Sequence, residues 1–558
     1  MSSAVATAGP STEGASSARL GRLWLAGVAA ALALYVLTLA PGLVWQDSGD
    51  YQLRAATLDL SRPGDAVRVH PWLLAVAWAL GRTGLWNYAY AANLASAVGT
   101  ALAVGNVLVL ARVLTGRAWP AVVAATTFAL GHAVWAHAVQ AETYGWTAAF
   151  LSAECLAAWA YLGSPLRVAC PRPARLPAGG SMRGHGHAPA QNMPTQTAAR
   201  HWAGRPWACH PRGLRWMVAL FLINGIAISN HMMAGLAAAV WGVWMAAEIV
   251  RRRAPGWILP ASAAAWLAGG TLYWIVLARE YAHLGSVAAT VRSATVGAWG
   301  ANIFNLADLP GLLGKSLMYI GLNYPTPLAA GIVVGAVVLV RRREAMGVLL
   351  VVLAAVYLAW AARYNVADQY AFFVPFYVPA SVMIGVACGA VWPGPRRIVP
   401  WVLVALAVLP VAVYAALPAA AQRAGVVFFK RELPYREPYT HFLQPWKRGD
   451  DGARRFATEV LESLPEGAVL LADSTAWPPL ACLQLNEGVR PDVTLASPLD
   501  PPWTTAYRLW YAKESPLASL AAEGKRVFSV SDQPGYVPRW MAGEVKFRPF
   551  GLIYECNP

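Results

Sequence analysis

The chain has 558 residues, of which 57% are hydrophobic and only 13% are charged. This composition excludes a soluble globular protein, in which about a quarter of residues are charged, and is typical of a polytopic α-helical membrane protein. The net charge of +16 comes from short arginine clusters between apolar segments and not from one basic face, which argues against a nucleic-acid partner.

Apolar segments of about 17 to 25 residues, each long enough to cross a lipid bilayer, recur along the chain, and we expect about eleven. They lie at 22–44, 88–111, 119–138, 143–162, 214–231, 233–250, 256–278, 326–340, 346–362, 373–392 and 398–419. The polar segment before them, 1–21, is expected to be disordered and cytoplasmic. The first apolar segment is long enough to stay as an anchor instead of being a cleaved signal peptide.

The arginine clusters give the expected topology. Clusters at 251–253, 341–343 and 396–397 all fall on one side of the membrane if there are eleven spans. The positive-inside rule makes that side cytoplasmic, so we expect a bacterial inner (plasma) membrane protein with a cytoplasmic N-terminus and an extracytoplasmic C-terminal domain. The segment 164–211 is rich in Pro, Gly, Arg and His and is expected to be a disordered cytoplasmic insertion. Its two histidines, His185 and His187, are then a solvated pair and not a metal site.

From residue 421 onwards the composition becomes that of a soluble domain. We therefore assign 22–420 to a transmembrane domain and 421–558 to an α/β domain. Helical and strand patterns alternate in this second part: a helix over 451–464, a strand over 468–472, a helix over 479–486, a strand ending at 496 and a helix–strand pair over 517–530. Cys482 and Cys556 both lie in this domain, where a disulfide between them is one option.

The first outer loop, 45–87, begins with Asp47 and Asp50 directly after a span. Carboxylates are costly to keep beside lipid, so acids in this place indicate chemistry. Asp50 precedes Arg54 by four residues, which suits an ion pair on a helix and leaves Asp47 free to act as a general base. The alternative is that Asp47 or Ser48 only caps a juxtamembrane helix.

Further candidate residues for substrate binding share the predicted outer face: Glu142, Tyr144, His231, Arg363, Asp368 and Tyr370. An ordinary interfacial position explains Glu142 equally well, and a lone histidine such as His231 is more often a packing residue. The cation, acid and tyrosines between the ninth and tenth spans suit a lipid phosphate and a sugar, although an interfacial aromatic belt also explains the tyrosines. No metal-binding motif or phosphate-binding loop occurs, so we expect no metal site and no cofactor, and the sequence leaves a role for a divalent metal open.

Several short motifs occur in a specific order: Trp45–Asp50, His70–Pro71, Ala141–Tyr144, Asn230–His231, Asp368–Tyr370, and in the tail Ala472–Thr475 and Glu487–Asp492. This order resembles the DUF2723 family, which is grouped with the membrane-embedded protein O-mannosyltransferases of the GT-C superfamily. The resemblance implies that 22–420 is a GT-C-like transmembrane domain and that the protein is a transferase of the cell envelope. Such an enzyme would pass a sugar, for example mannose, from a polyprenyl-phosphate donor to a hydroxyl of a protein, lipid or glycan acceptor.

The resemblance also implies residue roles. An acid of the first outer loop serves as the base in this superfamily, and it maps to Asp47 with Asp50 beside it. Cations must hold the donor phosphate, and Arg68, His70 and Arg363 are the nearest candidates on the outer face, with Arg54 close by. The leading alternative is a transporter or flippase for lipid-linked glycans, which predicts broken helices and charges buried in mid-span. A scaffold for envelope assembly is a third hypothesis.

Overall fold

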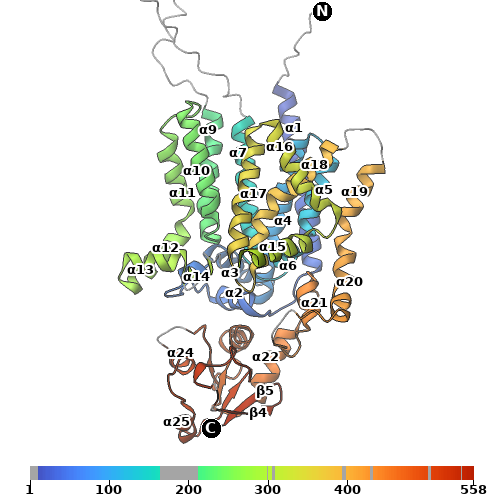
Figure 1. Ribbon diagram of the computed structural model, residues 1–558. Helices are drawn as coiled ribbons and strands as arrows, with labels where there is room; N and C mark the ends of the chain where they lie inside the picture. Colours follow the sequence, from blue (N-terminus) through green and yellow to red (C-terminus); the bar gives the residue numbers. More distant parts are fainter. Residues whose placement is uncertain are drawn as a thin grey trace, which may run out of the picture.

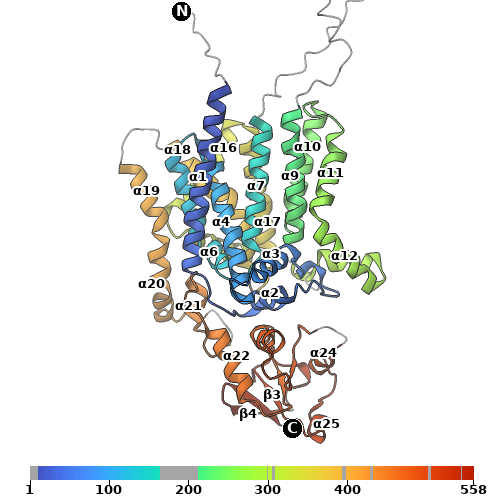
Figure 2. The same ribbon diagram turned by 180° about the vertical axis from the view of Figure 1, so that it is seen from behind.

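The computed structural model describes the chain except for residues 1–9, 164–210, 298–299, 304–307, 392–397, 428–430, 501–503, 542, 544 and 558. Figure 1 shows a long helical bundle with a smaller α/β domain at one end. The ends of α7 and α9 that border the segment 164–210 lie at the opposite end of the bundle (Figures 1 and 2). The expected disordered insertion itself, with His185 and His187, lies outside the described residues.

The bundle is built from α1 (Pro10–Leu37), α4 (Tyr88–Thr115), α5 (Ala118–Ala129), α6 (His132–Ala138), α7 (Tyr144–Gly163), α9 (Pro211–Asn230), α10 (Ala234–Val250), α11 (Ile258–Gly269), α16 (Gly331–Arg342), α17 (Ala345–Arg363), α18 (Val374–Val391), α19 (Ile398–Val408) and α20 (Pro410–Arg423). Helices α4 and α18 form its core, because most of their residues are buried. Helix α1 begins at Pro10, so helical structure starts earlier than the expected first span.

Among the described residues, six helices are long and apolar enough to cross a membrane, or eight if two bent helix pairs each form one span. The expected number of about eleven is not confirmed and stays a prediction. The expected spans 119–138 and 256–278 are each broken: α5 and α6 meet at 65°, and α11 meets α12 (Thr271–Leu284) at 69°. In both pairs the second helix, α6 or α12, lies near the end of the bundle that carries the α/β domain (Figure 1).

Short elements lie between the bundle and the α/β domain: α2 (Gln46–Thr57), η1 (Ala66–Arg68), α3 (Pro71–Arg82), α13 (Val287–Thr295), α14 (Gly300–Ile303), α15 (Leu309–Asn323), η3 (Pro327–Ala330) and η4 (Gln369–Phe373). Helix α2 has an acid in its first turn and Arg54 in its last turn, which suits the helix dipole. It ends at Leu58, which adopts a left-handed conformation with φ of 54°. The expected helical spacing after Asp47 is thus confirmed.

The C-terminal domain contains α21 (Pro438–Leu443), α22 (Gly452–Ser463), β1 (Val469–Leu471), α23 (Trp477–Ala481), a π-helical turn η5 (Cys482–Asn486), β2 (Thr494–Ala496), α24 (Thr505–Trp510), α25 (Leu517–Ala522), β3 (Val527–Ser529), η6 (Arg539–Met541), β4 (Lys546–Phe550) and β5 (Ile553–Asn557). The strand order is β2-β1-β3-β5-β4, with β1 parallel to both β2 and β3. The helices and strands expected over 451–530 are present, whereas the antiparallel pair β4–β5 was not expected.

The disulfide considered between Cys482 and Cys556 is not formed, and both cysteines are free and buried. Cys482 packs in the cluster of α22 and α23, and Cys556 packs in a separate cluster with Trp510 and Leu520. The two thiols therefore belong to different cores of the domain, which their positions in the sequence did not reveal.

Candidate active site

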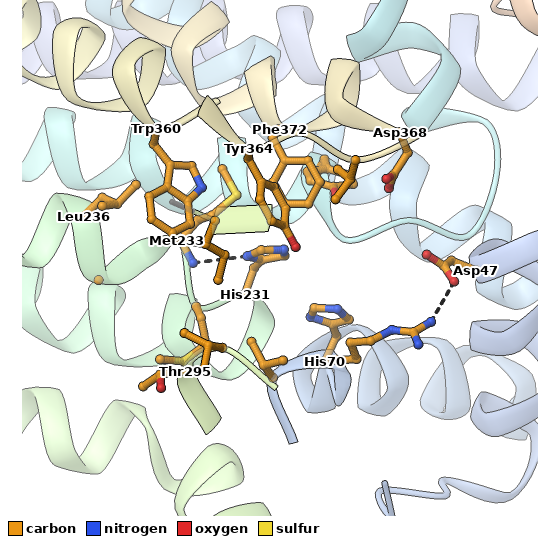
Figure 3. A pocket seen from close by; sticks show the side chains of 18 of the residues that line it. Asp47, His70, His231, Met233, Leu236, Thr295, Trp360, Tyr364, Asp368 and Phe372 are labelled. Carbon is orange, nitrogen blue, oxygen red and sulfur yellow. Dashed lines mark hydrogen bonds and ion pairs between the residues drawn. The ribbon is translucent and has the colours of Figure 1, made fainter. Parts of the chain in front are cut away.

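A cavity of about 260 Å³ lies where α2 and the residues just before α3 meet the link between α9 and α10 and the segment after α17 (Figure 3). Its polar lining includes Asp47, Arg68, His70, Tyr144, His231, Tyr364 and Asp368. Its apolar lining includes Met232, Met233, Leu236, Val296, Ile303, Trp360 and Phe372. The cavity therefore combines a charged part with an apolar part, as a site for an amphipathic molecule requires.

Asp47 and Arg68 form the charged part. Asp47 Oδ1 accepts a hydrogen bond from Arg68 Nη2 at 2.9 Å, and the Asp47 side chain is 48% exposed. Helix α2 has no side-chain cap at its N-cap residue, Trp45. Ser48 Oγ instead donates to Glu142 Oε1 at 2.7 Å. The structure therefore does not support the alternative that Asp47 or Ser48 caps the helix, and Asp47 presents its carboxylate to the cavity.

Asp50 is placed differently from Asp47. It is buried and forms ion pairs with Arg62 and, at 4.0 Å, with Arg54, as the spacing predicts. Burial would raise the pKa of this carboxyl, but the Arg62 and Arg54 guanidinium groups outweigh burial and lower it. Neither Asp50 nor Arg54 lines the cavity. Asp50 and Arg54 therefore form a buried ion-pair cluster outside the cavity lining, and the spacing along the chain does not indicate that Arg62 joins it.

Glu142 lies behind Asp47. Its backbone is fixed by Ser96, whose Oγ accepts from Glu142 N at 2.7 Å and donates to Glu142 O at 2.8 Å. Burial and then the neighbouring charge of Asp47 raise the pKa of Glu142 well above its ordinary value. The carboxyl group of Glu142 therefore favours the protonated form. Glu142 does not line the cavity, and its contact with α2 is the hydrogen bond that it accepts from Ser48.

His70 and His231 are far apart in the sequence and stack in the structure, with ring centroids 5.0 Å apart and planes at 17°. His70 Nδ1 lies 2.7 Å from Asn230 O, and a carbonyl oxygen can only accept, so this nitrogen carries the proton. His231 Nδ1 accepts from Met233 N at 3.1 Å, so the proton of its neutral ring is on Nε2. Burial lowers both pKa values, that of His231 to about 4. The neutral pair thus offers one acceptor, His70 Nε2, and one donor, His231 Nε2.

Asp368 also lines the cavity, where burial and then the charge of Asp47 raise its pKa to about 6. Tyr370 does not line it, and its ring packs against His137, with centroids 5.1 Å apart. Arg363 ends α17 and is not part of the lining either. Six of the expected site residues therefore line one cavity: Asp47, Arg68, His70, Tyr144, His231 and Asp368.

The apolar residues that line the cavity were not predicted from the sequence, because none of them belongs to a short recognisable motif. Trp360 is one of several aromatic residues in an apolar span, and Val296 and Ile303 lie between two expected spans, in a segment for which we expected no helix. Within the described part of the chain, no group of three or more His, Cys, Asp or Glu side chains is arranged to hold a metal ion.

No protein-family model and no curated protein matches the chain. Solved structures do match. ArnT from Cupriavidus metallidurans bound to undecaprenyl phosphate aligns with 96% of this chain and 98% of its own, with a TM-score of 0.51 and 14% identity. The apo form of the same ArnT gives a TM-score of 0.50 and 15% identity, over 97% and 98% of the two chains.

The fold resembles that of ArnT. This likeness agrees with the mostly helical membrane fold expected from the sequence, whereas membership of the GT-C superfamily and of the DUF2723 family stays a prediction. A more distant match is the Archaeoglobus fulgidus oligosaccharyltransferase tethered to an acceptor peptide, with a TM-score of 0.46 and 14% identity over 91% of this chain and 69% of its own. At these identities the likeness to ArnT concerns the fold alone, so residue roles rest on the geometry of the cavity.

Proposed function

We propose that this chain is a bacterial inner-membrane glycosyltransferase. It moves a sugar, expected to be a hexose such as mannose, from a polyprenyl-phosphate donor to a hydroxyl of a protein, lipid or glycan acceptor on the extracytoplasmic face. The observation that carries the proposal is the exposed Asp47 carboxylate, held by Arg68 in a cavity with one charged and one apolar part. The ArnT-like fold supports it, because that ArnT structure is bound to undecaprenyl phosphate.

Asp47 acts as the general base in this proposal. Its carboxylate takes the proton of the acceptor hydroxyl while the hydroxyl oxygen bonds to the anomeric carbon of the sugar. The bond between that carbon and the phosphate oxygen breaks, and its electron pair leaves with the polyprenyl phosphate, so the configuration inverts. Arg68 stabilises the negative charge on the leaving phosphate. Because the donor is already activated, the reaction draws no energy from a nucleotide cofactor.

The histidine pair and the apolar lining complete the donor site. His231 Nε2 is the donor for a phosphate or sugar oxygen, and His70 Nε2 is the acceptor for a sugar hydroxyl. Met233, Leu236 and Trp360 provide apolar surface for the first units of the polyprenyl chain. Asp368 and Tyr144 line the same cavity, and we assign them to the sugar.

The experiment uses purified protein in nanodiscs with a radiolabelled polyprenyl-phosphate hexose, and follows sugar release and transfer. Wild type is compared with Asp47→Asn and with Asp532→Asn, which changes an exposed aspartate of the C-terminal domain. We expect turnover by wild type and Asp532→Asn, and its loss in Asp47→Asn at an unchanged melting temperature. Equal turnover in all three would remove Asp47 from the reaction. Passage of the intact lipid across the bilayer would instead favour the flippase hypothesis.

A further inference from the structure

The residue before the proposed base has an unusual backbone. Gln46 has a φ of 56°, in the left-handed region that residues other than glycine rarely adopt. It is the first residue of α2, so its conformation sets the direction in which the helix leaves the preceding loop and presents Asp47. A non-glycine residue stays in this conformation only when its surroundings hold it there, and such residues are concentrated at functional sites.

Two contacts from the C-terminal part of the chain hold Gln46. Its backbone N donates to Thr475 O at 3.2 Å, and its side-chain Oε1 accepts from Arg436 Nη2 at 3.1 Å. The segment of Thr475 is itself fixed, because Thr475 N donates to Asp473 Oδ1 at 2.9 Å and Asp473 pairs with Arg431 at 2.8 Å. The tail motif 472–475 therefore lies directly against the start of α2.

The rest of α2 also packs on the C-terminal domain, as its place between bundle and domain in Figure 1 indicates. A Cβ atom on Gly49 would lie 2.8 Å from Pro478 Cβ, so the two elements approach as closely as a glycine allows. Asn486 Nδ2 donates to Leu53 O at 3.3 Å, one helical turn further on. Helix α2 is thus fixed by the domain at its start and along its length.

We propose that the C-terminal domain is a positioning element of the transfer site, in which Arg436 and the Asp473–Thr475 segment hold Gln46 left-handed and so aim the Asp47 carboxylate into the cavity. This inference rests on the proposed function. Arg436 acts here as a positioning residue, because it touches Gln46 and does not line the cavity. Its loss changes the placement of the base, and a misplacement of about 1 Å costs on the order of 100-fold in rate.

The test compares Arg436→Met with wild type under saturating and limiting donor. We expect kcat to fall by about 10-fold to 100-fold while KM for the donor stays within about twofold. Arg526→Gln, which breaks an exposed ion pair with Glu555 in the sheet, serves as the control and keeps wild-type kcat. A rise in KM with unchanged kcat would mean that Arg436 binds substrate, which overturns the proposal.

Rescue gives the readout that a merely structural role would not produce. Glycine adopts the left-handed conformation at no steric cost, so Gln46→Gly in the Arg436→Met background should recover most of the lost kcat. No recovery in a double variant that melts like Arg436→Met would overturn the proposal. If Arg436→Met does not fold, Gln46→Met removes the same hydrogen bond from the other partner and should show the same loss of kcat.

Hydrogen exchange separates this inference from the proposed function. We expect faster amide exchange over Gln46–Thr57 in Arg436→Met, with unchanged exchange over Tyr88–Thr115 in the bundle core. Unchanged exchange over α2 would refute the positioning role even in an active enzyme. If wild type transfers no sugar but exchange over α2 is faster in Arg436→Met, the proposed function is refuted. The inference that the C-terminal domain holds α2 would still stand.

Discussion

Arg68 joins two acids of the segment between α1 and α4. Its Nη2 donates to Asp47 Oδ1 at 2.9 Å, and its Nη1 lies 3.6 Å from Asp65 Oδ2. A guanidinium that is fixed by two carboxylates keeps one orientation before substrate arrives, which is the condition for effective electrostatic stabilisation. One side chain therefore both orients the proposed base and supplies a cation to the cavity.

Replacing Arg68 should affect catalysis more than folding. We expect Arg68→Gln to lower kcat/KM for the polyprenyl-phosphate sugar by about 100-fold to 1,000-fold, because the leaving phosphate loses its cation. Arg68→Lys should recover only part of this, because an ammonium cannot bridge Asp47 and Asp65 as a planar guanidinium does. Steady-state kinetics at several donor concentrations give kcat/KM for both variants. Equal values for wild type and Arg68→Gln would contradict the role of Arg68 in stabilising the leaving phosphate.

Replacing Arg62 should instead affect stability. Asp50 is 4% exposed, so loss of Arg62 leaves a buried carboxylate with only the longer contact to Arg54. A buried charge that loses its partner costs about 3 kcal/mol or more, and Arg62→Gln should therefore melt at a lower temperature. Adding Asp50→Asn removes the uncompensated charge, so the double variant should melt closer to wild type. A double variant less stable than Arg62→Gln alone would show that the unpaired Asp50 carboxylate does not cause the loss of stability.

Local spacing predicted part of this site. The step of four residues from Asp50 to Arg54 is a property of one helix, and the structure contains that pair. The partners that decide the roles come from elsewhere: Arg62 and Arg68 return from the segment after α2, and His231 meets His70 from the link between α9 and α10. Such pairings depend on how the chain closes on itself, which periodicity does not encode.

In the fold, too, local features were predicted and features that depend on long-range packing were not. Apolar segments predicted where most helices of the bundle lie, because hydrophobicity over about 20 residues is a local property. The breaks after Ala129 and Gly269 were not predicted, because neither apolar segment contains a charge or a long polar stretch at that point. The motif 472–475 stood out in the sequence, but its contact with Gln46 depends on how the two domains pack.

Asp368 should make stability depend on pH in a defined direction. Desolvation in the cavity wall and then the charge of Asp47 raise its pKa from 3.8 to about 6, so the folded protein keeps this proton where the unfolded chain has lost it. The residue is exposed on the cavity side, where water screens the charge, so we expect a small effect. The stabilisation due to this group is therefore complete at pH 4 and below, falls as pH rises toward 6 and is absent above that. Asparagine cannot ionise, so the difference in Tm between Asp368→Asn and wild type should be near zero at pH 4 and positive at pH 7.5. Thermal melting across this range measures it, and a difference independent of pH would contradict the raised pKa.

The approach of α16 to α18 supplies a last prediction that links packing to the site. A Cβ atom on Gly335 would lie 2.0 Å from Met383 O, a backbone atom of the central helix α18, whereas one on Gly314 in α15 would meet nothing within 4 Å. Gly335→Ala must therefore push the two helices apart, and overpacking of this kind costs about 1–3 kcal/mol. Gly314→Ala should be neutral or slightly stabilising, because alanine favours a helix over glycine.

Helix α18 follows directly on η4, which begins one residue after Asp368, so a shift of α18 also moves an acid of the cavity. We therefore expect Gly335→Ala to lower both the melting temperature and the rate of sugar transfer, and Gly314→Ala to change neither by much. Melting curves and initial rates on the same preparations measure the two effects. A destabilised Gly335→Ala variant with wild-type rates would mean that the cavity does not depend on the position of α18.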